Sequence, residues 1–556
     1  MPYNNNSMNI YYSNKNFIFN SKKKQVYIMN KNFIKYYGKI FFVIHRIIEF
    51  FGRWIFLLAA RFSGEPETLP PIDDGIVLMR SAKALSIMIL LKKINSETVV
   101  QACIDRIKKI QPVLNCVVEN RFTEALNEAR ECDRILKFAD PSILDLLKKE
   151  KPLFGVPFTT KDCIGIKDMK QTAGLYSRRN IQAEKDADVI QLLRQAGAIP
   201  IATTNVSELA MWWESANCIY GKTNNPYHTW HIVGGSSGGE GCLQAAAGAP
   251  FGIGSDIGGS IRMPCFFNGI FGHKPSRGIV SNVGQYPSPH TEKQNQLLAI
   301  GPMCRYATDL KHILKVIAGD NVSKLNLDAT VDISKLKFYY MEDDGGQLFV
   351  SPVSQDIKQK INKVIWYLKT GYKIKAEKVV IKKFKNSLAI WLANMVSPVG
   401  EDFAHELSNR QGRITIWWEF IKWMMCSSCH TFIALITAAF ESFGMKRDDE
   451  KRAKLLTQTL ELRDEFHNML GSDGVFLYPT HPTPAPLHHE TILKPFNFSY
   501  TAIINCLGLP ATACPLGFSN GLPIGIQVVA GLNQDHLSIA VAEELERIFG
   551  GWEKPK

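Results

Sequence analysis

Two serines set in glycine-rich turns are the residues of this chain best suited to covalent chemistry. Ser236 lies within residues 234–239, Gly-Gly-Ser-Ser-Gly-Gly, and Ser260 follows two glycines within residues 254–262. A hydroxyl that attacks a carbonyl must approach it closely, and neighbouring glycines remove the Cβ atoms that would stand in the way. The pattern predicts an enzyme that transfers acyl groups.

A base must accompany such a serine, because a hydroxyl is a weak nucleophile by itself. Lys161, in the segment Val156 to Asp162, is the candidate upstream of both serines. A lysine acts as a base only when neutral, and burial beside Pro157 and Phe158 would lower its pKa in that direction.

The loop before the second serine could bind the oxyanion of a tetrahedral intermediate. Ile257, Gly258, Gly259 and Ser260 offer successive backbone N–H groups close to the expected start of a helix. Asp256, Arg262 and, beside the first serine, Ser237 are expected to hold the two loops in shape without taking part in the chemistry.

These motifs resemble the amidase signature family of serine hydrolases. The resemblance extends from about residue 80 to the end of the sequence and includes residues 203–210, 271–276, 507–512 and 521–529. It implies one large α/β domain with a mixed central β-sheet flanked by helices on both faces. No cofactor or metal is expected.

The resemblance also implies a Ser-Ser-Lys triad, a variant of triad logic that needs no histidine. Ser260 would form the acyl-enzyme, Lys161 would be the base, and Ser236 would relay the proton between them. Within the family the chain is most similar to members that hydrolyse fatty-acid amides, such as oleamide and N-acylethanolamines, to a free fatty acid and an amine.

Other functions fit parts of the sequence. A general amidase or an amidotransferase of the tRNA-dependent type would share the serine loops but would not need the apolar segments described below. Residues 234–238 also match the G-x-S-x-G motif of α/β-hydrolases, with His481, His488 or His489 as a base. A glycine-rich phosphate-binding loop is disfavoured, because no G-K-[ST] motif follows the glycines. A catalytically inactive membrane-bound homologue is disfavoured by the intact Lys161 and serines.

The charge of the chain argues against a nucleic-acid partner. Ten lysines and arginines and one glutamate lie within residues 1–62, so most of the net charge of +13 belongs to this leader and the remaining residues are nearly neutral. A basic leader fits an anionic membrane surface. The 12 cysteines are too sparse for a disulfide framework, and the C-x-x-C-H pattern at residues 426–430 lacks any other feature of a haem protein.

The amino-terminal part divides into three segments. Residues 1–39 form a basic leader expected to be disordered, in which Met29 is an alternative start. Residues 40–62 predict a hydrophobic helix whose charges, Arg46, Glu49 and Arg53, form one stripe, as in a helix lying in a membrane interface. Two alternatives for this helix are left open: that it spans a membrane, or that it packs on the protein itself. Residues 63–76 predict a linker.

The catalytic domain is expected over residues 77–556. Residues 77–135 predict helices, and the later alternation of short β-rich runs with helices indicates an α/β sheet. Residues 414–440 predict a hairpin of two short apolar helices that caps the site at a membrane, with a buried helical pair or a dimer contact as the alternatives. The expected location is an intracellular membrane, either the endoplasmic reticulum or a lipid droplet. A homodimer is a family expectation.

Overall fold

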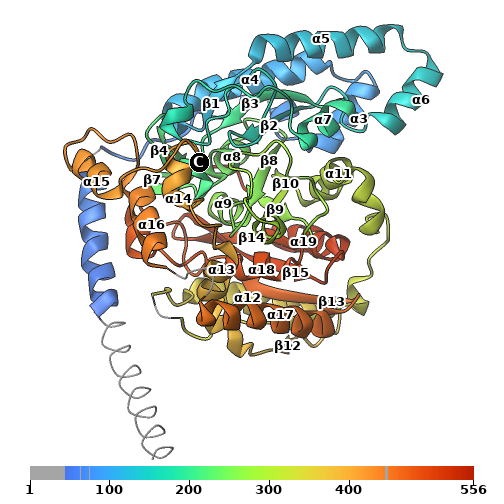
Figure 1. Cartoon of the computed structure of the whole chain (residues 1–556). Coiled ribbons are helices and arrows are strands. Elements are labelled where there is room, and N and C mark those ends of the chain that lie inside the picture. The colour runs from blue at the N-terminus through green and yellow to red at the C-terminus, as the bar shows by residue number, and fades with distance from the viewer. Residues whose placement is uncertain (1–43, 63, 74, 348, 445–448, 556) are drawn as a thin grey trace, which may run out of the picture.

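The computed structural model describes residues 44–62, 64–73, 75–347, 349–444 and 449–555. The predicted leader, with Met29, lies outside the described residues, as do the first four residues of the predicted amino-terminal helix. Figure 1 shows the sheet at the centre of the molecule, with helices packed around it.

One mixed sheet of eleven strands runs through the described part of the chain, in the order β1-β3-β2-β8-β10-β9-β14-β15-β13-β11-β12. Parallel pairing joins β2 to β3 and β8, and β11 to β12 and β13, whereas the other neighbours are antiparallel. The strands are β1 (Val117–Asn120), β2 (Pro157–Lys161), β3 (Ile199–Thr204), β8 (Phe251–Asp256), β9 (Phe271–Lys274), β10 (Ala299–Cys304), β11 (Lys337–Tyr340), β12 (Glu377–Lys378), β13 (Gly474–Pro479), β14 (Ala511–Ser519) and β15 (Leu522–Ala530). Two ribbons, β4 (Ala216–Asn217) with β5 (Gly221–Lys222) and β6 (Asn224–Asn225) with β7 (His228–Ile232), lie outside this sheet.

Helices cover the sheet, as the α/β pattern predicts. They are α2 (Gly75–Leu78), α3 (Ala82–Leu90), α4 (Ser96–Leu114), α5 (Phe122–Phe138), α6 (Pro141–Glu150), α7 (Asp188–Gln195), α8 (Gly238–Ala245), α9 (Arg262–Asn268), α10 (Glu292–Leu297), α11 (Ala307–Ile317), α12 (Gln355–Gly371), α13 (Ser387–Met395), α14 (Phe403–Leu407), α15 (Ile416–Met424), α16 (Phe432–Phe443), α17 (Glu450–Leu470), α18 (Ser499–Leu507) and α19 (Asp535–Phe549). Helices α4, α5 and α8 share one apolar cluster, whereas α7, α11 and α19 pack in a row, against β3, β10 and β14 respectively. The strand β1 interrupts the region predicted to be helical.

The alternation of side chains along β2 determines which face of the sheet Lys161 points to. Phe158 stacks on Phe251 of β8 in the main apolar core, with ring centroids 5.5 Å apart. Thr159 and Lys161 point to the other face, because successive side chains of a strand alternate. Thr159 there bonds to Glu240 of α8. The end of β2 therefore directs Lys161 towards the loop that precedes α8.

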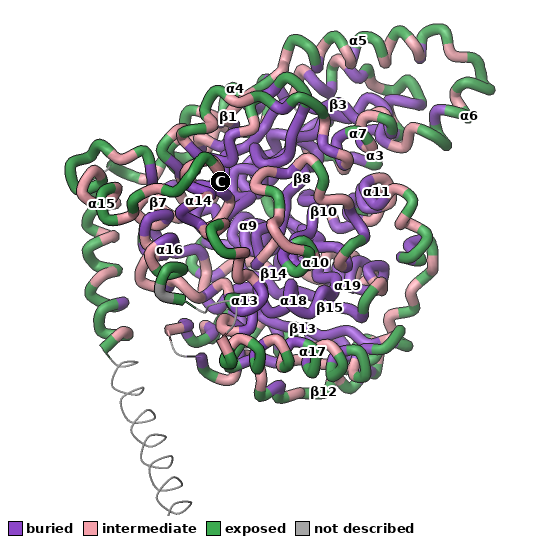
Figure 2. Tube along the Cα trace, in the orientation of Figure 1, coloured by how far each residue is buried: buried purple, intermediate pink, exposed green. Residues whose placement is uncertain are grey.

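The predicted hairpin of apolar helices is present as α15 and α16, which pack against each other. Figure 1 shows these helices and the helix of residues 44–62 at one end of the molecule, and Figure 2 shows much of their surface exposed. Among the described residues, no helix combines the length and the apolar character needed to cross a bilayer.

The predicted stripe of charges on the amino-terminal helix does not face water as a whole. Glu49 is buried, bonds to Arg46 and accepts a hydrogen bond from Ser351 Oγ at 3.2 Å. The reason is packing: the helix touches the body at Glu49 and at His45, whose ring meets that of Phe349 with centroids 5.3 Å apart. Arg46 and Arg53 stay exposed, together with apolar and aromatic side chains that include Phe50, Phe51, Trp54, Ile55 and Phe62.

Candidate active site

The predicted base and the first serine lie in contact. Lys161 Nζ is 2.7 Å from Ser236 Oγ and 3.0 Å from Ser255 Oγ. Lys161 is only 1% exposed, and this burial lowers its pKa from the ordinary lysine value. A buried amine with hydroxyl partners and no direct carboxylate partner can be neutral, so it can accept a proton.

The loop of the first serine is shaped by close backbone contacts. The peptide bond between Gly235 and Ser236 is cis. A Cβ at Gly235 would lie 2.6 Å from the carbonyl oxygen of Trp212, so no larger residue fits there without a shift. Ser215 Oγ donates to the carbonyl of Gly234 at 3.0 Å and accepts from the N–H of Gly238 at 3.0 Å. These contacts hold Ser236 in one place at the start of α8.

The loop of the second serine is held by a buried ion pair. Arg262 donates to both carboxylate oxygens of Asp256, each at 3.0 Å, and both side chains are fully buried. Burial alone would raise the pKa of Asp256, but the charge and hydrogen bonds of Arg262 hold it well below its usual range. Arg262 also donates to Gln527 Oε1 at 2.7 Å and to Asn505 Oδ1 at 2.5 Å. Asp256 and Arg262 are thus placed to support the loop.

The four predicted oxyanion donors are not equivalent. The N–H of Gly259 donates to Asp256 Oδ1 at 2.7 Å, which ties this group into the loop's own structure. Among the residues described, the N–H groups of Ile257, Gly258 and Ser260 make no hydrogen bond. Gly259 has a φ of +129°, and a Cβ there would lie 2.0 Å from Thr501 Oγ1, so the sharp turn requires glycine. The candidate donors are therefore reduced to three.

The two serine loops lie side by side. The N–H of Ser237 donates to the carbonyl of Ser260 at 3.3 Å, and Ser237 Oγ accepts from the N–H of Ser255 at 3.3 Å. Ser260 is 8% exposed, against 1% for Ser236 and Lys161. The side chain predicted to meet substrate is thus the most accessible of the three.

Several residues that support this site were not predicted. Ser255, the second partner of Lys161, directly precedes Asp256, and its place in the Gly-Ser-Asp run was the only available signal. Trp391 and Asn505 come from helices α13 and α18 and bond to the loop of the second serine. Nothing in their local sequence marks them. Only the fold brings them to the loop.

Glu240 of α8 lies fully buried next to β2, the strand that ends at Lys161. It accepts hydrogen bonds from Thr204 Oγ1 and Gln244 Nε2, both at 2.8 Å, and bonds to Thr159. Burial raises its pKa to about 7. These bonds fix α8, and with it the loop of Ser236, against the strands β2 and β3.

A cavity of about 780 Å³ lies under the α15–α16 hairpin. Its walls combine Met211 and Trp212 from the body with Trp423, Met424 and Phe432 from the hairpin. The floor includes Glu214, whose neighbour Ser215 holds the loop of Ser236. The cavity is mostly apolar, and none of Lys161, Ser236 and Ser260 lines it.

The C-x-x-C-H pattern serves the hairpin. His430 Nδ1 lies 2.7 Å from Glu208 Oε1, and the N–H of Thr431 donates to Glu208 Oε2 at 2.8 Å, while Cys426 and Cys429 are exposed thiols. Glu208 therefore fixes the start of α16 to the body.

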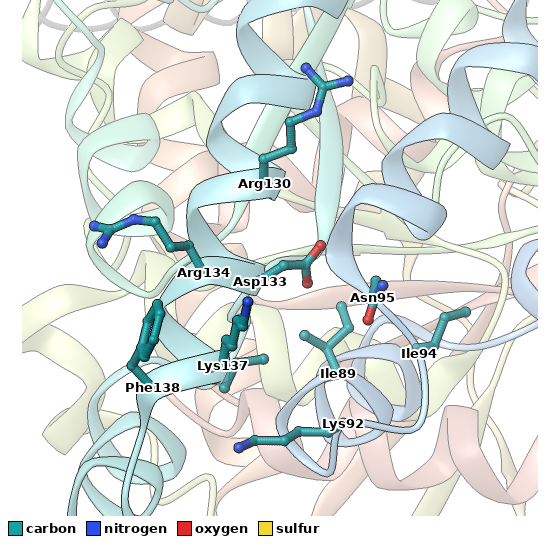
Figure 3. A pocket seen from close by; sticks show the side chains of 10 residues that line it. Ile89, Lys92, Ile94, Asn95, Arg130, Asp133, Arg134, Lys137 and Phe138 are labelled. Atoms are coloured by element: carbon teal, nitrogen blue, oxygen red, sulfur yellow. The ribbon is translucent and has the colours of Figure 1, made fainter.

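A second hollow, of about 480 Å³, opens between α3 and α5 (Figure 3). Its cationic side chains are partly paired: Arg130 donates to Glu97 at 2.8 Å and Arg134 to Glu131 at 2.6 Å. None of the predicted catalytic residues lines it.

The sequence matches a known family over most of its length. The family described as Amidase matches residues 98–538. The chain is 47% identical to fatty-acid amide hydrolase 2 from Homo sapiens over 498 residues, which cover 88% of this chain and 92% of that protein. It is 46% identical to fatty-acid amide hydrolase 2-A from Danio rerio over 494 residues, again 88% of this chain and 92% of that protein.

Solved structures share the fold. A structure of fatty acid amide hydrolase superposes with a TM-score of 0.68 at 23% identity, covering 87% of each chain. A structure of 6-aminohexanoate cyclic dimer hydrolase gives a TM-score of 0.67 at 20% identity, covering 86% of this chain and 99% of that one. The mixed sheet and its helices are therefore an established arrangement.

Proposed function

Because this chain belongs to the amidase signature family and is a hydrolase that acts on amide bonds, we propose that it cleaves fatty-acid amides at Ser260. The substrates are primary amides such as oleamide and N-acylethanolamines, and the products are a free fatty acid and ammonia or an amine. The observation that carries the proposal is the buried contact of Lys161 with Ser236, beside the loop of Ser260.

The contacts support the following sequence of steps. Neutral Lys161 takes the proton of Ser236, which takes the proton of Ser260 as its oxygen attacks the amide carbonyl. The N–H groups of Ile257, Gly258 and Ser260 stabilise the oxyanion. The proton then returns through Ser236 to the leaving nitrogen, and an acyl-enzyme forms. Water, activated by the same base, releases the acid.

The preference for a long acyl chain is supported by two features. The relatives at 45–47% identity are named for fatty-acid amides. The mostly apolar cavity under the hairpin offers a place where a hydrocarbon chain leaves water, and burying apolar surface stabilises a complex by about 25 cal/mol per Å².

Membrane attachment is the second part of the proposal. The hairpin exposes Trp417, Trp418, Met424 and Met425, and the helix of residues 44–62 exposes a second apolar face at the same end of the molecule (Figures 1 and 2). Aromatic side chains of this kind favour the headgroup boundary of a bilayer. We place the enzyme on an intracellular membrane, where substrate would enter from the lipid, and expect a homodimer.

Release of oleic acid from oleamide by membranes that carry this chain tests the proposal. We expect turnover by the wild type, no turnover by Ser260→Ala at matched expression, and fluorophosphonate labelling that disappears in the same variant. Labelling at Ser260 without cleavage of oleamide would support the proposed mechanism but reject oleamide as a substrate. Release of ammonia from L-glutamine instead would favour an amidotransferase-like activity. Absence of both labelling and turnover would reject the mechanism.

A further inference from the structure

The three free N–H groups of the serine loop can act together only if their directions are fixed. In a trans peptide the carbonyl and the following N–H point in opposite directions within one plane. A hydrogen bond that holds a carbonyl therefore also sets the direction of the next residue's N–H. The carbonyls that precede Ile257, Gly258 and Ser260 each accept a hydrogen bond, so all three N–H groups have set directions.

Two of these carbonyls accept hydrogen bonds from groups that also belong to the ion-pair network or to the backbone. Asn505 Nδ2 donates to the carbonyl of Asp256 at 3.0 Å, and the same amide also bonds to the Asp256 carboxylate and to Arg262. The N–H of Met263 donates to the carbonyl of Gly259 at 2.8 Å. A change at either position would disturb the ion pair or the backbone as well.

The third carbonyl is held by a side chain from a distant helix. Trp391 of α13 donates its indole N–H to the carbonyl of Ile257 at 2.9 Å. The indole lies against Gly258, because a Cβ there would be 3.4 Å from Trp391 Nε1. The ring is 7% exposed and meets Phe498 edge to face, with centroids 5.1 Å apart. Packing therefore fixes the donor before any substrate binds.

We propose that Trp391 is a positioning residue that aims the N–H of Gly258 at the oxyanion of the reacting amide. An indole N–H can only donate a hydrogen bond. It is therefore satisfied by only one orientation of the peptide between Ile257 and Gly258, the one that turns the carbonyl of Ile257 towards it. Reversing that peptide would leave a buried donor unpaired, which is unfavourable. The inference rests on the proposed function, because it assumes attack by Ser260.

Thr501 supplies a matched comparison at the next peptide. Its hydroxyl donates to the carbonyl of Gly258 at 2.7 Å. The N–H of that peptide belongs to Gly259 and is already bonded to Asp256. Thr501 and Trp391 thus each hold one carbonyl of the same loop, but only Trp391 sets the direction of an N–H that is free.

The experiment compares Trp391→Phe with Thr501→Val in the full-length enzyme. Removing one direct donor from an oxyanion site costs about 10²–10³ in rate, so a misdirected donor should cost about 10-fold in kcat. We expect Trp391→Phe to lower kcat on oleamide by that factor with KM nearly unchanged. It should weaken binding of an oleoyl trifluoromethyl ketone, which forms a tetrahedral adduct, by the same factor, and Thr501→Val should do so much less.

Trp366→Phe, at an exposed tryptophan of α12, controls for the loss of an indole. It should change neither kcat on oleamide nor the affinity for the ketone. If Trp391→Phe does not fold, benzothienylalanine at position 391, which keeps the ring shape without the N–H, serves in its place.

Two outcomes would overturn the inference. One is a ketone affinity that falls equally in Trp391→Phe and Thr501→Val. The other is a rise in KM at constant kcat, which would make Trp391 a wall of the substrate site. Fluorophosphonate labelling of the wild type separates these results from failure of the mechanism, since an unlabelled Ser260 would reject the proposed function and this inference with it.

Discussion

The serine loops and the apolar end of the molecule depart from the usual distribution of side chains in opposite ways. At the serine loops, charged and polar groups are buried: Lys161, Asp256 and Arg262 have at most 1% exposure. At the hairpin and the amino-terminal helix, large apolar side chains are exposed, with Trp417 at 66%, Met425 at 72% and Phe62 at 90%.

Each reversal costs stability, so each points to a use. A buried charge is tolerated only with partners, and the pair of Asp256 with Arg262 has them, whereas Lys161 has hydroxyls that suit a neutral amine. Exposed apolar patches mark surfaces that bind a partner or a membrane. Under the proposed function, the chemistry at the serine loops would depend on exclusion of water, and membrane attachment at the other end would depend on contact with lipid.

The largest expected effect concerns the base. Lys161→Ala should slow acylation by about 10³-fold at neutral pH, within the range for loss of a general base. The deficit should shrink at high pH, where solvent base replaces the amine. In the wild type the rate should rise with pH as Lys161 loses its proton, and reach its plateau below the ordinary lysine pKa because burial lowers it. Rates of fluorophosphonate labelling across neutral to alkaline pH measure this, and an equal deficit at every pH would contradict the assignment.

Breaking the buried ion pair comes next. Arg262→Met leaves the carboxylate of Asp256 buried without its cation, and loss of one partner of such a pair costs about 3–5 kcal/mol of the free energy of unfolding. Denaturant unfolding measures the change. Arg547→Met is the control, because that exposed arginine pairs with Glu544 at the surface and should leave the midpoint nearly unchanged. Similar shifts in both variants would show that burial does not distinguish the two pairs.

Glu240→Gln tests burial of a carboxyl group without a cation. Burial raises the pKa of Glu240 from 4.5 to about 7, so the folded state holds a proton that the unfolded state releases between these values. The wild type should lose stability as pH rises through this window, by about 3 kcal/mol, and Glu240→Gln should lose less. Unfolding midpoints of the wild type and of Glu240→Gln, measured below and above this pH window, test this expectation. If the variant shows the same pH dependence as the wild type, the pKa of Glu240 is not raised.

The smallest effect is expected at the exposed end. Trp417→Ser combined with Met424→Ser removes apolar area from the hairpin and should weaken binding to phospholipid vesicles about 10-fold, equivalent to about 1.4 kcal/mol. Cleavage of a short, soluble anilide should not change. Trp366→Ser removes a tryptophan that is 62% exposed on α12 and should leave vesicle binding intact. Equal weakening by the control would mean that the hairpin is no special contact surface.

Local sequence was sufficient for the strands with strong apolar runs. Among the short β-rich runs of the sequence, residues 337–340 coincide with β11, and the runs at residues 156–160 and 474–478 lie within one residue of β2 and β13. The strands β9 and β10 were not predicted. Each mixes glycine with lysine, histidine or proline, so neither shows the alternation of a strand, and each forms only because neighbours on both sides complete its hydrogen bonds.

The amino-terminal helix shows the limit of periodicity. The spacing of Arg46, Glu49 and Arg53 predicts one charged side, but periodicity does not say what that side faces. Contact with the body buries Glu49 and leaves the apolar side exposed.

The sequence by itself determined which groups could do chemistry, because glycines around Ser236 and Ser260 and a lysine upstream are local features of the chain. Only the tertiary structure decided which groups are free to do it. The N–H of Gly259 is used by Asp256, Ser255 is a second partner of Lys161, and Trp391 reaches the loop from a helix far along the chain. Hydrogen bonds depend on distance and direction in space, and a linear sequence fixes neither for residues that only folding brings together.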